Sequence, residues 1–235
     1  MAKARALYGD AQIQPSDVRV ESVLTASKVS HTFNLNGNGS TKRPLEQYIS
    51  NNDLFIMYAL KVGVQKVSTL PTLAAISGGN YPVYTYPDKY VFDDAGTVNN
   101  VSEANALEAV FNGSMGMKAN TYELINQVKL NRFRNVPETQ ASLTTQAETH
   151  IENFVIFEQP AILSGRDTNL LDFIAAQGAD TALIGGKADT ENVLVFQALG
   201  LTVRDGALAA TFVELEGMTY EQRLKKLTID GRLLK

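Results

Sequence analysis

The sequence predicts a mostly β protein that folds as an antiparallel β-sandwich. Short stretches alternate apolar and polar residues with period two, turn residues separate them at fairly regular intervals, and the strand–helix alternation of parallel α/β folds is missing. The chain has 235 residues, of which 44% are hydrophobic, so it can bury a substantial core and fits one domain of sandwich size. We expect roughly nine to twelve strands and one or two short helices, at the spacing typical of sandwiches.

The beginning of the chain predicts an arm followed by the first strands. Residues 1–15 mix small and charged residues without periodicity, which indicates a flexible or partner-ordered arm before a single sandwich domain over residues 16–235. Alternation then predicts strands over residues 18–23 and 31–35.

The next segments predict a central strand and an edge segment. Residues 54–64 are rich in β-branched and aromatic side chains and predict a long central strand, in which Gly63 marks a bulge or a bend. Residues 81–87 are interrupted by prolines, which confine them to a sheet edge or an extended connection.

The middle of the chain contains the clearest local turn signal. Asn112-Gly113 lies between two extended runs within residues 109–117 and predicts a two-residue hairpin turn of type I′. Residues 121–128 have helical spacing, and the alternative is a strand that runs to Phe133. Residues 137–148 are polar and predict an exposed loop or a polar helix.

The second half of the chain predicts further short strands and a C-terminal helix. Thr219 and Gln222 form an approximate capping box at the start of a helix over residues 219–227. Together the pattern favours a jelly-roll sandwich among several antiparallel topologies. The strands expected here cover residues 151–157, 170–175, 182–184, 193–199, 201–203 and 209–215.

The composition excludes several kinds of chemistry. The chain has no cysteine, which removes disulfides, zinc–cysteine sites and thiol nucleophiles. Its two histidines, His31 and His150, belong to no metal-binding motif, and the sequence contains neither a GxSxG elbow nor a phosphate-binding loop. We therefore expect no cofactor, no metal and no enzymatic activity. The formal net charge of −4 argues against a strongly basic nucleic-acid-binding domain.

Paired carboxylates leave one enzymatic alternative open. Asp93-Asp94 and the pair Glu214 and Glu216 could serve a β-sandwich hydrolase, because glycoside hydrolases use two acids. Acids on strands mostly face solvent, which makes this the weaker interpretation.

Basic clusters and tyrosines are the candidate contact residues. Lys129, Arg132 and Arg134 alternate with apolar residues and predict a local contact with nucleic acid or with an acidic neighbouring subunit, against a solvated strand face. A second basic cluster, Arg223, Lys225 and Lys226, is expected to be solubilising. Aromatic side chains outside an obvious core strand suit a subunit interface, and those proposed here are Tyr81, Tyr84 and Tyr86.

In four short stretches the sequence resembles phage virion structural proteins. They are residues 43–46, 52–55, 84–88 and 110–113, within a cysteine-free chain rich in Asn, Thr and Gly. The chain resembles these proteins loosely over residues 18–215. The resemblance implies a jelly-roll capsid protein that self-associates in many copies and has no active site.

The first hypothesis is therefore a bacteriophage shell protein, most simply a major capsid protein. It implies other copies of the chain, other virion proteins and packaged nucleic acid as partners, and a location in the virion after synthesis in the host cytoplasm. The alternatives are a fibre, spike or carbohydrate-binding sandwich, and the carboxylate-pair hydrolase. No apolar run approaches the roughly 18–20 residues of a membrane-spanning helix, so we expect no membrane span.

Overall fold

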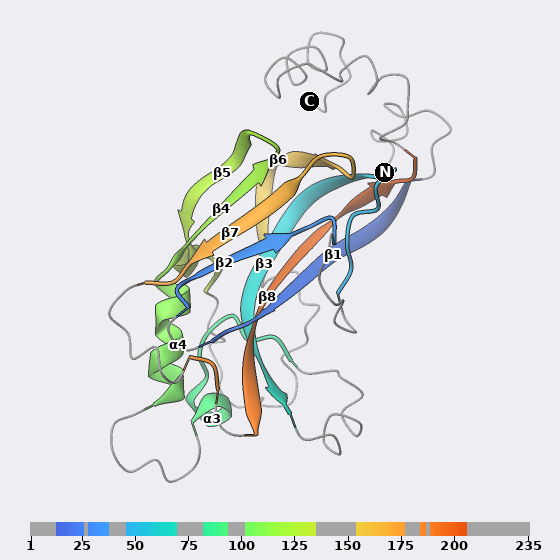
Figure 1. Ribbon diagram of the computed structural model, residues 1–235. Coiled ribbons are helices and arrows are strands. Elements are labelled where there is room, and N and C mark those ends of the chain that lie inside the picture. The colour runs from blue at the N-terminus through green and yellow to red at the C-terminus, as the bar shows by residue number, and fades with distance from the viewer. Residues whose placement is uncertain are drawn as a thin grey trace.

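The chain folds into two four-stranded antiparallel sheets in a computed structural model (Figure 1). The structure describes residues 13–25, 28–37, 46–69, 82–93, 102–134, 154–176, 184–186 and 189–205. The mostly β, antiparallel prediction is confirmed.

The first sheet has the strand order β1-β8-β3-β6. Its two central strands, β3 and β8, pair over their whole shared length, from Leu54 opposite Val203 to Ser68 opposite Thr190. The edge strand β1 pairs with β8, and the edge strand β6 pairs with β3. The strands are β1 (Ile13–Val23), β8 (Thr190–Val203), β3 (Leu54–Ser68) and β6 (Val155–Ser164).

The second sheet has the strand order β2-β7-β4-β5. β7 pairs with both β2 and β4, and β4 forms a hairpin with β5 whose two-residue loop is Asn120-Thr121. Asn120 has φ 54°, a conformation that Asn tolerates better than most residues. The strands are β2 (Ser30–Asn34), β7 (Asn169–Ile174), β4 (Ser114–Ala119) and β5 (Tyr122–Lys129).

In the described part of the chain, two α-helices lie below the β2-β7-β4-β5 sheet in Figure 1, beside the lower part of β8. They are α3 (Lys89–Phe92) and α4 (Glu103–Phe111), and a 3₁₀ turn, η1 (Leu130–Phe133), follows β5. The Ser102 hydroxyl caps α4 by accepting a hydrogen bond from the Asn105 amide at 3.1 Å. No helix in the described part of the chain is long and apolar enough to cross a membrane.

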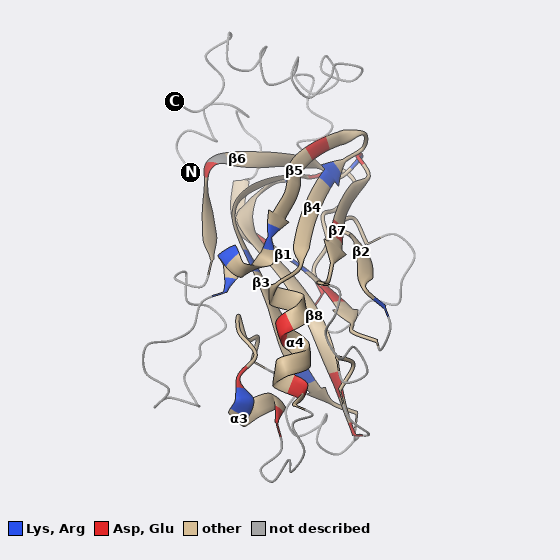
Figure 2. Ribbon diagram, turned by 90° about the vertical axis from the view of Figure 1, so that its left-hand side faces the viewer, with Lys and Arg blue, Asp and Glu red and all other residues tan. Residues whose placement is uncertain are grey.

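The core fills the space between the two sheets. Alternate residues are buried in β2, β4 and β7, as a half-buried strand requires, whereas the central strand β3 is buried at nearly every position. Val18 and Val20 from β1, and Phe33 from β2, belong to one apolar cluster. Leu107 and Phe111 of α4 join the same cluster and close this end of the core. Among the described residues, those with charged side chains are spread over both sheets and the helices and are not gathered on one face (Figure 2).

The hairpin predicted at Asn112-Gly113 is wrong. The preceding residues form α4, which ends at Phe111 and is capped by Asn112 in an αR conformation, and β4 begins at Ser114. Asn and Gly are also common at the C-terminal ends of helices. Here the apolar face of α4 is buried, which favours a helix end over a hairpin turn at Asn112-Gly113. Gly113 is needed for close packing, because a Cβ there would collide with the carbonyl oxygen of Ile174.

Other strand predictions shift along the chain. The helix predicted over residues 121–128 is wrong, and the alternative of a strand holds: β5 begins at Tyr122, but it ends at Lys129 and not at Phe133. The two strands expected over residues 193–199 and 201–203 are one continuous strand, β8, which contains Gly200. Residues 209–215 and the helix expected at 219–227 lie outside the described residues.

The bulge predicted at Gly63 lies elsewhere. The register of β3 shifts between Met57 and Ala59. At Gly63 the chain instead makes a close contact, since a Cβ there would lie 2.6 Å from the carbonyl oxygen of Tyr84. The Val64 amide donates a hydrogen bond to that oxygen at 2.8 Å, and Tyr84 is the only described residue of the extended 81–87 segment that forms a β-bridge.

Candidate functional site

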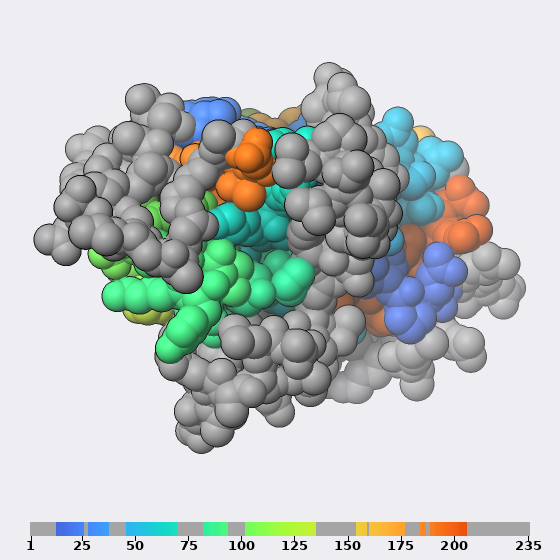
Figure 3. Space-filling view, turned by 90° about the horizontal axis from the view of Figure 1, so that it is seen from below, coloured from blue at the N-terminus to red at the C-terminus, as the bar shows by residue number. Residues whose placement is uncertain are grey.

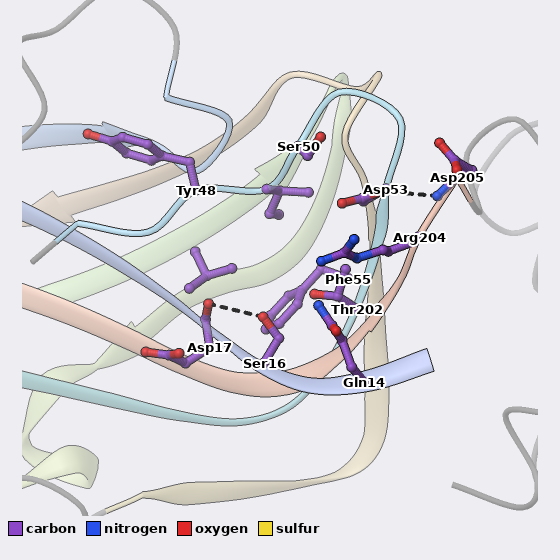
Figure 4. Close-up of a pocket in the computed structure, with 12 residues that line it drawn as sticks. Gln14, Ser16, Asp17, Tyr48, Ser50, Asp53, Phe55, Thr202, Arg204 and Asp205 are labelled. Atoms are coloured by element: carbon purple, nitrogen blue, oxygen red, sulfur yellow. Dashed lines mark hydrogen bonds between the residues drawn. The ribbon is translucent and has the colours of Figure 1, made fainter. Parts of the chain in front are cut away.

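A polar cleft of about 430 Å³ opens where β1 and β3 begin and β8 ends. Figure 4 shows the side chains of Gln14, Thr202 and Arg204 close together, with Tyr48 apart from them. The Asp205 amide donates a hydrogen bond to Asp53 Oδ1 at 3.0 Å, which fixes the end of β8 against the start of β3. The cleft is lined by Gln14, Ser16, Asp17, Val18, Tyr48, Ile49, Ser50, Asp53, Phe55, Thr202, Arg204 and Asp205.

The lining of this cleft is mostly polar. Its ionisable groups are three aspartates, one arginine and the phenol of Tyr48, and no histidine lines it. Among the residues that the structure describes, no three His, Cys, Asp or Glu side chains gather as metal ligands do. The cleft therefore offers hydrogen-bonding groups to a polar surface.

A second, smaller depression lies on the outer face of the β2-β7-β4-β5 sheet. Its volume is about 360 Å³, and the small residues Ser30, Ser114 and Gly116 are among those that line it. Two residues of β5, Asn126 and Gln127, oppose the single residue Gly116, which is the pattern of a β-bulge. The bulge places Gln127 at φ 37°.

The predicted basic cluster consists of Lys129 at the end of β5, Arg132 in η1 and Arg134 directly after η1, and all three residues are exposed. Arg134 donates a hydrogen bond to Glu108 of α4 at 2.8 Å, and both partners are partly exposed. Lys129 and Arg132 lie on either side of the buried Leu130. Of the three predicted contact residues, Arg134 thus forms an ion pair within the chain. A contact of the cluster with nucleic acid or with a neighbouring subunit stays a prediction.

The tyrosines predicted for an interface lie in different surroundings. Tyr81 lies outside the described residues. Tyr84 and Tyr86 are each only 7% exposed, and Tyr84 packs edge-on against Phe92 at 5.7 Å between ring centroids. Burial raises the pKa of the Tyr84 hydroxyl, and the charge of Asp88 adds to that shift. The two rings pack mostly within the chain, and their contact with another subunit stays a prediction.

The two histidines and the paired carboxylates do not come together in the described part of the chain. His31 is buried between the sheets and contacts Phe173, while His150 lies outside the described residues. Asp93 caps α4: its carboxylate accepts hydrogen bonds from the Ser102 hydroxyl and the Ala104 amide. Asp94, Glu214 and Glu216, and the basic cluster Arg223, Lys225 and Lys226, lie outside the described residues.

Sequence reasoning missed the exposed apolar pair Tyr58 and Ile156. Ile156 is 63% exposed on the edge strand β6, opposite Ala59, and Tyr58, 36% exposed, directly precedes Ala59. The register of β3 shifts at Tyr58, between Met57 and Ala59. The shift interrupts the alternation of side chains between the two faces of the sheet, so the side on which the Tyr58 ring lies does not follow from the sequence pattern. The sequence carries no turn residue at that point that would have indicated the shift.

No protein-family model, curated protein or solved structure matches this chain.

Proposed function

We propose that the chain is a jelly roll that serves as a self-assembling shell subunit of a virus, as a bacteriophage capsid protein does. The pairing of strands carries this proposal. A jelly roll arises when a long antiparallel ribbon of eight strands is rolled up, so that each strand pairs with the one at the same distance from the other end of the ribbon. The pairs β1–β8, β2–β7, β3–β6 and β4–β5 all occur here and are antiparallel.

Two further pairings support the rolled ribbon. β3 also pairs with β8, and β4 with β7, which joins the four pairs into the two sheets. Eight-stranded jelly rolls occur in viral capsid and lectin domains and in cupins. Of these, the capsid is favoured by an interior that large apolar side chains fill, Phe55, Phe173 and Phe196 among them, since such a core makes a rigid building block.

Exposed apolar side chains support contacts outside the chain. Ile156 and Tyr58 lie on and beside the edge strand β6, where an apolar patch is favourable only if something covers it. We propose that a neighbouring subunit covers this pair. The basic residues Lys129 and Arg132 would then face packaged nucleic acid or an acidic neighbour.

The size of the purified full-length protein tests the proposal. We expect light scattering after gel filtration to give many-copy assemblies, and negative-stain electron microscopy to show particles or rings of uniform size. A monomer at every protein and salt concentration would overturn the shell function.

A surface variant makes the test specific. Burying an isoleucine side chain stabilises a contact by about 1.5–3 kcal/mol, and each 1.4 kcal/mol corresponds to a factor of about ten in affinity. Ile156→Asp should therefore weaken each contact about tenfold or more. Asn52→Asp adds the same charge at another exposed position and should assemble as the unaltered chain does. Equal assembly of both variants would contradict a contact at Ile156.

A further inference from the structure

An amine, a carboxyl group and a carboxamide meet in the interior near α4. Lys66 of β3 lies directly opposite Asn192 of β8 in the sheet register. Glu103, the first residue of α4, contacts both: Lys66 Nζ lies 3.3 Å from Glu103 Oε2, and Asn192 Nδ2 donates a hydrogen bond to Glu103 Oε1 at 2.6 Å. One carboxylate thus holds the amine nitrogen with one oxygen and the amide nitrogen with the other.

These three groups are shielded from solvent. The side chain of Glu103 is 0% exposed and that of Lys66 is 15% exposed, and Asn192 is fully buried. The next inward pair on the same strands, Val64 and Leu194, belongs to the apolar core. Figure 3 shows this end of the molecule from below, with the β3, β8 and α3–α4 regions next to one another. Electrostatic interactions between charged and polar groups are stronger in a buried, weakly polar interior than in water.

The orientation of the Asn192 amide follows from its neighbours. Nδ2 faces Glu103 Oε1 and the carbonyl oxygen of Ile184, at 2.6 and 3.2 Å. Both are acceptors, so the opposite orientation would set the amide oxygen against a carboxylate and a carbonyl. The amide therefore presents its nitrogen, which is the leaving group of an acyl transfer, to the carboxyl group.

Two backbone carbonyl groups also bind the amine of Lys66, on the strand next to Asn192. Lys66 Nζ donates to the carbonyl oxygens of Val91 and Phe92 at 3.2 and 3.1 Å. Directly opposed residues of antiparallel strands have Cβ atoms about 4.5–5.5 Å apart, and the flexible four-carbon stem of a lysine spans that separation. Holding two reactants in this way replaces a bimolecular encounter by a reaction within one molecule.

We propose that Lys66 and Asn192 form an intramolecular isopeptide bond, with Glu103 as the catalytic residue that transfers the protons. Glu103 takes a proton from Lys66 Nζ, and the amine attacks Asn192 Cγ. The Nζ–Cγ bond forms, the Cγ–Nδ2 bond breaks, and Glu103 passes a proton to the departing nitrogen. Ammonia leaves and takes up the remaining proton of the lysine ammonium, so Glu103 returns to its starting state and nothing is oxidised or reduced.

The bond would join the two central strands of the first sheet. Lys66 and Asn192 lie 126 residues apart in sequence (192 − 66), and the covalent link would stop β3 and β8 from separating. It does not depend on assembly, because all three residues belong to one chain.

Mass spectrometry of the purified full-length protein under denaturing conditions tests the proposal. We expect an intact mass about 17 Da below that of the unmodified sequence, since one ammonia is lost in this covalent modification. A tryptic digest should contain a branched peptide in which the segment with Lys66 is joined to the segment with Asn192. An unmodified mass together with tryptic cleavage after Lys66 would overturn the proposal, and this measurement needs no variant to fold.

Variants test the role of each group. Lys66→Arg and Glu103→Gln should lack the branched peptide, and its persistence in Glu103→Gln would overturn the catalytic role of Glu103. Asn192→Asp should form the same bond with loss of water, a decrease of about 18 Da from the mass of its own sequence. Lys118→Arg is the matched control, because Lys118 forms an exposed ion pair with Glu123 at 3.7 Å, and it should keep the branched peptide.

Discussion

The imidazole of His31 and the hydroxyl of Ser22 join the two sheets across the interior. Nδ1 of His31 on β2 lies 3.1 Å from Oγ of Ser22 on β1. His31 is only 1% exposed and its ring packs against Phe173, with 5.8 Å between the ring centroids. An ionisable group therefore takes the place of an apolar side chain between the sheets.

We predict that this arrangement makes the protein less stable in mild acid. Burial lowers the pKa of His31 below its usual 6.5, and the positive charge of Lys28 lowers it further. Between the folded pKa and 6.5 the unfolded chain binds more protons than the folded chain, so the free energy of unfolding rises with pH in that window. The stabilisation is present above pH 6.5 and is lost as the pH falls through the folded pKa.

Chemical denaturation at a series of pH values between 7.5 and 5, below and above the usual histidine pKa of about 6.5, measures this effect. His31→Gln keeps a polar partner for Ser22 and removes the titration, so its stability should change less across the window. His150→Gln removes the other histidine and should leave the pH dependence of the unaltered chain. Equal pH slopes for His31→Gln and the unaltered chain would rule out His31 as the cause.

The strand pattern could be predicted from the sequence because burial of one sheet face imposes period two. Residues 31–35, 54–64 and 170–175 alternate or carry strand-forming side chains, and strands occur there. Local turn chemistry was less informative. Asn112-Gly113 has the residues of a hairpin turn, but packing of Leu107 and Phe111 into the core selects the helix end.

The candidate sites could be predicted only in part, because they depend on contacts between distant segments. The basic residues Lys129 and Arg132 are exposed as a contact surface requires. Tyr84 instead packs against Phe92 within the chain. Nothing in the sequence indicated that Lys66 and Asn192 would be register partners, since strand pairing arises from the topology as a whole.

Gly63 and Gly116 provide a matched test of close packing. A Cβ on Gly63 would lie 2.6 Å from both the Tyr84 oxygen and a Val83 methyl group, whereas one on Gly116 would meet nothing closer than 3.4 Å. We expect Gly63→Ala to lower the free energy of unfolding by about 1–3 kcal/mol, the usual cost of overpacking. Gly116→Ala should leave it unchanged or raise it by up to about 1 kcal/mol, because alanine restricts the unfolded chain. Urea denaturation measures both, and equal stabilities of the two variants would show that the contact at Gly63 relaxes without cost.

Asn169 connects the start of β7 to two other segments and is fully buried. Its side-chain Nδ2 donates hydrogen bonds to Asn36 Oδ1 at 2.9 Å and to the carbonyl oxygen of Ser164 at 2.8 Å. Asn36 in turn donates to the carbonyl oxygen of Gly165 at 2.7 Å, so the group fixes the turn between β6 and β7 against the end of β2. If the Asn169 side chain is removed, each acceptor keeps one longer hydrogen bond from a backbone amide, from Asn169 to Asn36 Oδ1 at 3.3 Å and from Asp167 to the Ser164 carbonyl oxygen at 3.1 Å. The expected cost is therefore that of the two lost side-chain bonds.

Asn169→Ala should therefore lower the free energy of unfolding by about 1–3 kcal/mol, at roughly 0.5–1.5 kcal/mol for each of the two lost side-chain hydrogen bonds. Asn169→Asp has nearly the same shape but no amide donor, so its carboxylate would face two acceptors, and we expect it to be at least as unstable as the alanine variant at neutral pH. Asn126→Ala, at an exposed position on β5, should change stability by less than about 0.5 kcal/mol. Thermal and urea denaturation of the three variants measures these differences. If Asn169→Asp were as stable as the unaltered chain, shape and not hydrogen bonding would explain why asparagine occupies this position.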